Sequence, residues 1–265
     1  MNKKNNNSFK TSSNAGWIKF LGTAGARFVM IKQLRSSGGI WINAEGENIL
    51  FDPGPGSLVQ CNKTRPALNP ESLDAIILSH KHLDHCCDIN VMIEAMTGGG
   101  FKKRGKVFCP SDALKNDPVI LKYTQKLPEE IIKIKERTKY KIDDFEFETS
   151  MRHIHASETY GIKFKLNSTS VSILSDTKYF PQLKNFYSTD ILIISVTFYE
   201  PRHDIAHLCL DDVRKIIQQT NPKKVVLTHF GMSMLKHKPN ILAKQLSKEL
   251  NTEVIAAYDG MIINP

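Results

Sequence analysis

The 265-residue sequence has no apolar run long enough to cross a membrane, so it does not predict a membrane-spanning protein. It also lacks a Pro/Gly/Ser-rich linker and an internal repeat, which favours a single domain over residues 16–265. Residues 1–15 contain almost nothing apolar and lack the apolar segment of a signal peptide. We expect these residues to form a disordered tail in front of a domain large enough to bury a substantial core.

Cysteine is scarce and follows no pattern. The five cysteines are an odd number, and their spacing does not suggest a disulfide framework. They predict free thiols in a reducing compartment, and hence a cytoplasmic protein. Cys86 and Cys87 follow a histidine-rich segment directly, but zinc sites use spaced cysteines, so we expect these two to serve packing.

The formal net charge is +9, yet the basic residues are not interleaved with aromatic ones. A stacking platform for single-stranded nucleic acid is therefore not predicted. Lysines scattered over solvated faces are the usual explanation of such a charge. The charge gives only weak support to an anionic substrate.

The most informative segment is the histidine-rich run Ser79-His80-Lys81-His82-Leu83-Asp84-His85. It follows the apolar residues 75–78, which predict a buried strand, and open α/β sheets place their chemistry at such carboxyl ends. In extended chain His80 and His82 project to the same side and can bind one metal ion. Asp84 and His85, beyond the strand, can turn toward a second ion. Imidazole and carboxylate suit zinc, iron and manganese.

This run resembles the signature of the metallo-β-lactamase fold superfamily, and the resemblance extends from Trp17 to Pro265. It implies an α/β fold, an αββα four-layer sandwich of two mixed sheets flanked by helices. The predicted elements agree, because strands come in two groups, each followed by helices. The longest predicted helices cover residues 88–96, 210–219 and 238–250.

The resemblance also implies three ligands outside the run. Either His153 or His155 is a candidate from the residues alone, but the ribonuclease Z branch has its third histidine a few residues before a Tyr-Gly pair. The pair Tyr160-Gly161 therefore favours His155. Asp176, in Ser175-Asp176-Thr177, resembles the Gly-Asp-Thr turn of the family with serine in place of glycine. His229, at the end of a predicted strand, resembles the last ligand.

The implied metal centre holds two divalent ions. By resemblance, His80, His82 and His155 hold one ion and Asp84, His85 and His229 hold the other, while Asp176 and a water-derived hydroxide bridge them. Zinc is the first expectation, with manganese and iron as alternatives. Asp84 has a second implied role as a catalytic base that orients the water. We expect Asp52, by contrast, to satisfy backbone groups near the site rather than to bind metal.

His207 is the second residue to which we assign a catalytic role. It precedes a predicted helix in a segment that resembles the His-x-Thr/Ser stretch of ribonuclease Z, whose histidine helps to hold the phosphate and the leaving oxygen. An imidazolium at this position could donate a proton to a departing alkoxide. The alternative is a histidine at a helix N-terminus without a catalytic role. Arg202 and His203 could add positive charge at the same place.

The branch implied by these motifs contains ribonuclease Z and cyclic phosphodiesterases. Ribonuclease Z carries a long arm that clamps tRNA between its third histidine and its bridging aspartate, whereas only a predicted hairpin separates His155 from Asp176. We therefore expect a phosphodiesterase acting on a small anionic or phosphodiester substrate, with nucleic acid still open as a partner but not through such an arm. The sequence also leaves a homodimer open.

Two other functions remain as hypotheses. The same dinuclear centre could hydrolyse a carboxylic ester, a thioester or a lactone by stabilising a tetrahedral oxyanion. Alternatively, the fold could serve as a non-catalytic scaffold that binds nucleic acid, although a complete set of seven ligands argues against this.

Overall fold

The computed structural model describes residues 16–25 and 27–265, and its strands form two seven-stranded sheets. The predicted tail, residues 1–15, lies outside the described residues. The first sheet has the order β14 (Ile262–Ile263), β1 (Trp17–Phe20), β2 (Ile40–Ala44), β3 (Glu47–Phe51), β4 (Ala75–Ile77), β5 (Lys106–Cys109), β6 (Glu130–Lys133). The second has the order β13 (Glu253–Ala256), β12 (Lys224–Thr228), β11 (Ile191–Ser195), β10 (Thr169–Leu174), β9 (Ile162–Leu166), β8 (Phe145–Thr149), β7 (Lys139–Ile142).

Eight α-helices occur in the described residues. They are α1 (Phe28–Ile31), α2 (Ser57–Lys63), α3 (Leu83–Cys86), α4 (Ile89–Met96), α5 (Lys184–Tyr187), α6 (Leu210–Thr220), α7 (Met232–Lys236) and α8 (Pro239–Leu250). Short 3₁₀ segments cover Pro70–Ser72, Ser111–Leu114, Thr124–Lys126 and Pro181–Leu183. No helix of the described chain is both long and apolar enough to span a bilayer.

Each sheet is antiparallel in one half and parallel in the other. In the first sheet β14, β1, β2 and β3 pair antiparallel, and β3 to β6 pair parallel. In the second, β7 to β10 are antiparallel and β10 to β13 parallel. Because parallel strands all end at the same edge, each sheet gathers several chain segments at one edge.

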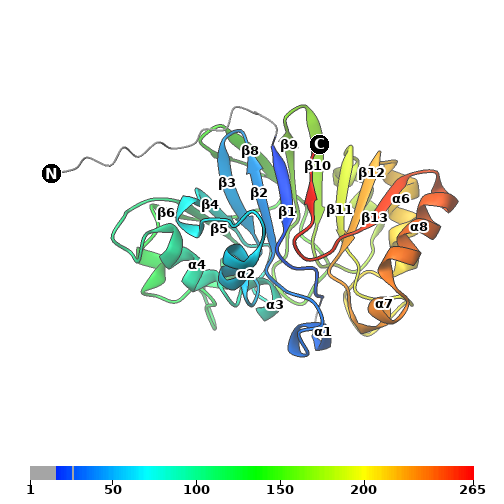
Figure 1. The fold of residues 1–265 in the computed structure, drawn as a ribbon, viewed down its shortest axis with the longest axis horizontal. Helices are drawn as coiled ribbons and strands as arrows, with labels where there is room; N and C mark the ends of the chain where they lie inside the picture. The colour runs from blue at the N-terminus through cyan, green and yellow to red at the C-terminus, as the bar shows by residue number, and fades with distance from the viewer. Residues whose placement is uncertain (1–15, 26) are drawn as a thin grey trace.

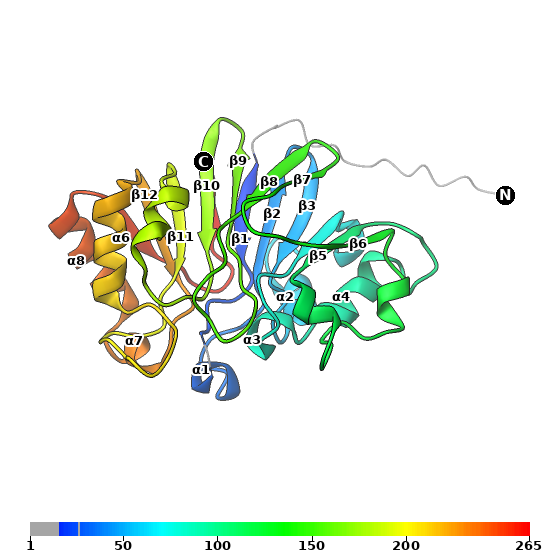
Figure 2. The ribbon, with the colours of Figure 1, turned by 180° about the vertical axis from the view of Figure 1, so that it is seen from behind.

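The sheets face each other, and helices cover their outer faces (Figures 1 and 2). Alternate strand residues, such as Phe20, Ile77 and Phe164, form the core between the sheets. On the outer face of the first sheet, Ile76 packs with Met92 of α4 in a second buried cluster. A third cluster joins the second sheet to α6 and α8. The fold is the predicted αββα sandwich.

The predicted elements agree closely with the observed ones wherever the pattern is long. The hairpin predicted around Glu45-Gly46 connects β2 and β3, and both residues have positive φ, 53° and 88°, as a tight two-residue hairpin turn requires. The predicted helices correspond to α4, α6 and α8. Five short helices, α1, α2, α3, α5 and α7, were not predicted, because four to seven residues make only one or two turns, too few for a helical pattern of apolar residues to show in the sequence.

The contact between the two sheets gives the first prediction. Phe147 on β8 packs edge to face on Phe108 of β5, with ring centroids 5.1 Å apart. Phe147→Ala should lower the free energy of unfolding by about 3–5 kcal/mol, because it leaves a cavity between the sheets. Urea denaturation measures this loss. Phe101→Ala is the control, since Phe101 is 94% exposed and its removal should change stability by less than about 0.5 kcal/mol. Equal effects of the two variants would contradict the assignment of this core.

Candidate metal centre

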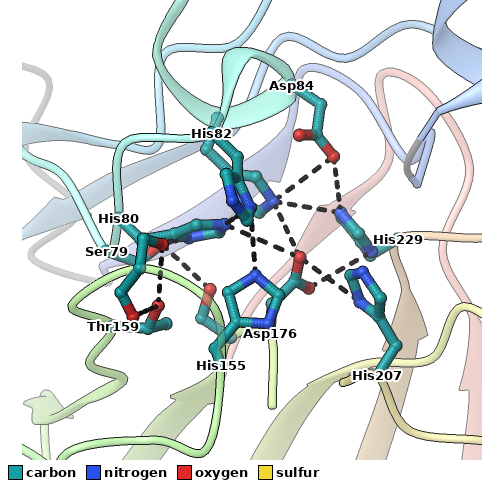
Figure 3. Close-up of polar contacts among 12 residues, drawn as sticks. Ser79, His80, His82, Asp84, His155, Thr159, Asp176, His207 and His229 are labelled. Carbon is teal, nitrogen blue, oxygen red and sulfur yellow. Dashed lines mark hydrogen bonds and ion pairs between the residues drawn. The ribbon is translucent and has the colours of Figure 1, made fainter. Parts of the chain in front are cut away.

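Polar side chains converge where the parallel strands of both sheets end (Figure 3). The chain after β4 supplies His80 and His82, and α3 supplies Asp84 and His85. The remaining members come from the second half of the chain: His155 from the β8–β9 connection, Asp176 after β10, His207 before α6, and His229 after β12. The structure thus brings together all seven residues proposed as ligands, together with His207.

Three imidazoles form the first group. Nδ1 of His82 lies 3.1 Å from Nε2 of His80 and 3.0 Å from Nε2 of His155. The three nitrogens lie within 4.8 Å of one another, close enough to hold one cation together.

The second group contains two imidazoles and two carboxylates. Nε2 of His85 and Nε2 of His229 are 3.0 Å apart. Asp84 Oδ2 lies 3.2 Å from His229 Nε2 and 3.6 Å from His85 Nε2. Asp176 Oδ2 lies 3.3 Å from His85 Nε2, which completes a second set of atoms within reach of one cation.

Asp176 lies between the two groups. Its Oδ2 is 3.7 Å from Nε2 of His80 in the first group and 3.3 Å from Nε2 of His85 in the second. The side chain is buried, and neither carboxylate oxygen has a hydrogen-bond partner among the described residues. A buried carboxylate without a hydrogen bond is costly, and cations between it and the surrounding nitrogens would compensate that cost. The donor set therefore fits two divalent cations, and its imidazoles and carboxylates suit zinc.

The second ring nitrogens of these histidines are held by neighbouring acceptors. Nδ1 of His80 donates to Ser79 Oγ at 2.9 Å, and Nδ1 of His155 donates to the Ala206 carbonyl at 2.9 Å. Nδ1 of His85 donates to Asp52 Oδ2 at 2.8 Å. With the proton on Nδ1, each ring presents the lone pair of Nε2 to the centre, as outer partners of metal-binding histidines do.

Burial controls the protonation of the first group. It lowers the pKa of His80 well below the usual value and lowers those of His82 and His155 as well, so these rings are neutral at neutral pH and can bind metal. Burial also opposes a charge on His85, but the carboxylates of Asp84 and Asp52 raise its pKa well above the usual value. The second group therefore attracts positive charge, which a metal ion can supply in place of a proton.

His153 points away from the centre and has a different role. Its Nδ1 donates to the backbone carbonyl of Asp176 at 3.0 Å, and its Nε2 accepts from the Tyr187 hydroxyl at 2.6 Å. Burial lowers its pKa to about 4. Of the two candidates, the structure places His155, and not His153, beside His82.

His207 lies at the edge of the centre. Its Nδ1 is 3.5 Å from Asp176 Oδ2 and 3.3 Å from Thr197 Oγ1. Burial opposes its charged form, but the nearby Asp176 carboxylate raises the pKa of His207 above its usual value. Arg202 is paired with Asp204 at 3.0 Å beside the same opening, and His203 is exposed and makes no contact with the centre in the described part of the chain.

Two residues of the site have left-handed backbone conformations, with φ of 61° at His229 and 54° at Asp52. Such strain at non-glycine residues persists only where the surroundings fix it. The amide after His229, Phe230 N, donates to Thr23 O at 2.9 Å, and Gly25 N donates to Phe230 O at 2.9 Å. A Cβ at Gly25 would lie 2.3 Å from the His229 carbonyl oxygen, so only glycine allows this approach.

The sequence analysis missed some of the supporting residues. Asp52 was expected only to satisfy backbone groups, and it does accept from Ser79 N at 2.6 Å, but it also fixes His85. Thr197, whose Oγ1 lies 3.1 Å from His229 Nδ1, was not predicted at all. Their positions in the sequence could have indicated them, because Asp52 directly follows β3 and Thr197 closely follows β11, and both strands end at this edge.

The contrast between His153 and His155 gives a prediction. His155→Ala should reduce bound metal from about two equivalents per chain to about one, since one cation loses a ligand. His153→Ala should keep its metal but lose about 1–3 kcal/mol of stability, because buried partners of His153 lose their hydrogen bonds. Elemental analysis and urea denaturation of both variants measure these effects. Full metal content in His155→Ala, or equal metal loss in both, would contradict the assignment.

The outer contact of His85 gives a third prediction. Asp52→Asn weakens the acceptor that orients His85 and should lower metal affinity about 10- to 100-fold. Competition with a chromogenic chelator measures the affinity. Asp144→Asn, at an exposed turn, is the control and should bind metal as the unmodified protein does. Unchanged affinity in Asp52→Asn would show that this contact does not support the centre.

Comparison with known proteins agrees with this geometry. The family model described as "Beta-lactamase superfamily domain" matches residues 47–230. An uncharacterized protein of Methanocaldococcus jannaschii is 32% identical over 257 residues, which are 92% of this chain and 93% of that protein. Ribonuclease Z of Methanosarcina acetivorans is 34% identical over 94 residues, which are 36% of this chain and 29% of that enzyme.

Solved structures show the same fold. The metallo-β-lactamase fold protein YhfI from Bacillus subtilis superposes with a TM-score of 0.76 at 20% identity, over 95% of this chain and 100% of that one. A diphosphatase from the PhnP family superposes with a TM-score of 0.70 at 19% identity, over 94% and 97%. The chain therefore belongs to the beta-lactamase superfamily and has the metallo-β-lactamase fold, and 94 of its residues are similar in sequence to part of ribonuclease Z.

Proposed function

We propose that this chain is a metal-dependent phosphodiesterase. In this proposal His80, His82 and His155 hold one cation, Asp84, His85 and His229 hold a second, and Asp176 contacts both. The buried Asp176 carboxylate, which has no hydrogen-bond partner within the described chain and is flanked by imidazoles of both groups, is the observation that carries the proposal. Zinc is the proposed metal, with manganese and iron as alternatives.

The names of similar proteins support phosphate-ester chemistry. One relative is a ribonuclease, and one structural neighbour is a diphosphatase. Only the hairpin of β9 and β10 and its flanking loops separate His155 from Asp176. We infer that the substrate is a small phosphodiester rather than one held by a long arm.

Two divalent cations would activate water and stabilise the charge that develops on a phosphoryl group. Asp84 supplies a carboxylate at the edge of the second group, where it can accept the proton of the attacking water. The water oxygen forms a bond to phosphorus, and the bond from phosphorus to the leaving oxygen breaks.

His207 is placed to protonate that leaving oxygen. Its Nδ1 faces Thr197 and Asp176, while Nε2 has no hydrogen-bond partner among the described residues. His207 also lines the cleft next to the centre, so Nε2 can donate a proton to a group in that cleft. In this mechanism Asp84 is the general base and His207 is the general acid.

The role of His207 can be tested with two kinds of leaving group. His207→Ala should lower kcat about 100-fold for an alkyl leaving group, which needs a proton, and much less for p-nitrophenolate, which does not. Methyl p-nitrophenyl phosphate and dialkyl phosphodiesters are the substrates. His203→Ala, in the same loop and exposed, is the matched control and should behave as the unmodified enzyme does.

Two results would contradict this function. An equal loss for both leaving groups in His207→Ala would remove the residue from proton transfer. Faster hydrolysis of lactones or thioesters than of any phosphodiester would instead favour carboxylic ester hydrolysis at the same centre.

A further inference from the structure

A cleft of about 890 Å³ lies beside the metal centre, and His207 is only one of the residues that line it. Its walls come from three segments far apart in the sequence: the start of α1, the chain from Thr197 to His207, and α7. Figures 1 and 2 show α1 and α7 at the same end of the sandwich. Thr197 and His207 both line the cleft and contact each other, and His207 also lies 3.5 Å from Asp176, so the cleft continues from the centre on the side of His207.

Aromatic side chains form part of the cleft wall. Tyr199 stacks on His237 with ring centroids 3.7 Å apart and planes inclined by 8°. The Tyr199 amide donates to Ser233 Oγ at 3.1 Å, which fixes the start of this segment to α7. Phe28 on the opposite segment is 60% exposed. Rigid, partly solvated aromatic surfaces of this kind suit a planar ring that stacks on them.

The charged residues of the cleft are mostly cationic. Arg27, Arg202 and Lys236 line it, whereas Glu200 is its single acidic lining residue. Arg202 is neutralised by Asp204, but Arg27 and Lys236 have no ion-pair partner in the described part of the chain. The cleft therefore attracts an anion next to its aromatic surface.

We propose that this cleft binds a nucleotide as the leaving group of the substrate, an inference that rests on the proposed phosphodiesterase function. The base stacks against Tyr199 and Phe28, an anionic phosphate lies near Lys236 and Arg27, and the leaving oxygen lies beside His207. Hydrolysis adds water across the bond from phosphorus to that oxygen and releases the nucleotide into the cleft. The volume falls within the range of small-molecule sites, roughly 300–1,000 Å³, and favours one nucleotide over a polymer.

Direct binding tests the proposal independently of turnover. Isothermal titration of the metal-loaded protein with AMP and with ribose 5-phosphate compares two ligands that carry the same phosphate and differ in the base. AMP should bind at least about tenfold more tightly, because only AMP can stack. Equal affinities would overturn the proposal, even if phosphodiesters are hydrolysed. Failure to hydrolyse any phosphodiester, with the preference for AMP intact, would instead overturn the proposed function.

Substitutions in the cleft test where the base and the phosphate of the nucleotide bind. Tyr199→Ala and Phe28→Ala should each reduce the preference for AMP toward the affinity of ribose 5-phosphate, and Tyr199→Phe should retain it because the ring remains. Phe28 is mostly exposed, so its loss does not endanger folding. Lys236→Ala should weaken both ligands, since both carry the phosphate.

Tyr123→Ala, an exposed tyrosine outside the cleft, is the control and should leave both affinities unchanged. A preference for AMP that persists in both Tyr199→Ala and Phe28→Ala would place the base elsewhere and overturn the assignment. Much tighter, strongly salt-dependent binding of single-stranded RNA than of AMP would also overturn it, in favour of a polymer.

Discussion

The candidate metal centre is arranged around one buried carboxylate. Asp176 lies between two groups of imidazoles, and neither of its oxygens finds a hydrogen-bond donor among the described residues. The free-energy cost of burying an ionised carboxylate far exceeds the free energy of unfolding of a typical domain, unless opposite charge compensates it. Outer contacts hold the surrounding histidines by their second nitrogens and leave lone pairs facing inward. This arrangement of a buried carboxylate and inward-facing lone pairs fits a binding site for cations.

The fold explains why candidate ligands from distant segments meet. Parallel strands in each sheet end at the same edge, so the chain after β4 and the chain after β10 and β12 reach one place. Backbone contacts between the two halves, such as those that hold the left-handed conformation of His229, fix that place. The rigid core between the sheets therefore supports the centre, and the cleft lies next to it among shorter helices and loops.

Local patterns determined how much could be predicted from the sequence. The run from His80 to His85 was informative because its four candidate ligands lie in one short segment after a buried strand. Asp52 and Thr197 were harder to predict, since their contacts with His85 and His229 depend on which strands become neighbours. The cleft could not be predicted from the sequence for the same reason. Phe28, Tyr199 and His237 are far apart in sequence and line one cleft only in the folded chain.

Anomalous X-ray diffraction from crystals of the zinc-loaded protein tests the central claim most directly. The account predicts two peaks about 3.5–4 Å apart. One should be ligated by the histidines of the first group, the other by Asp84, His85 and His229, with Asp176 in contact with both. A single peak, or peaks away from Asp176, would contradict it.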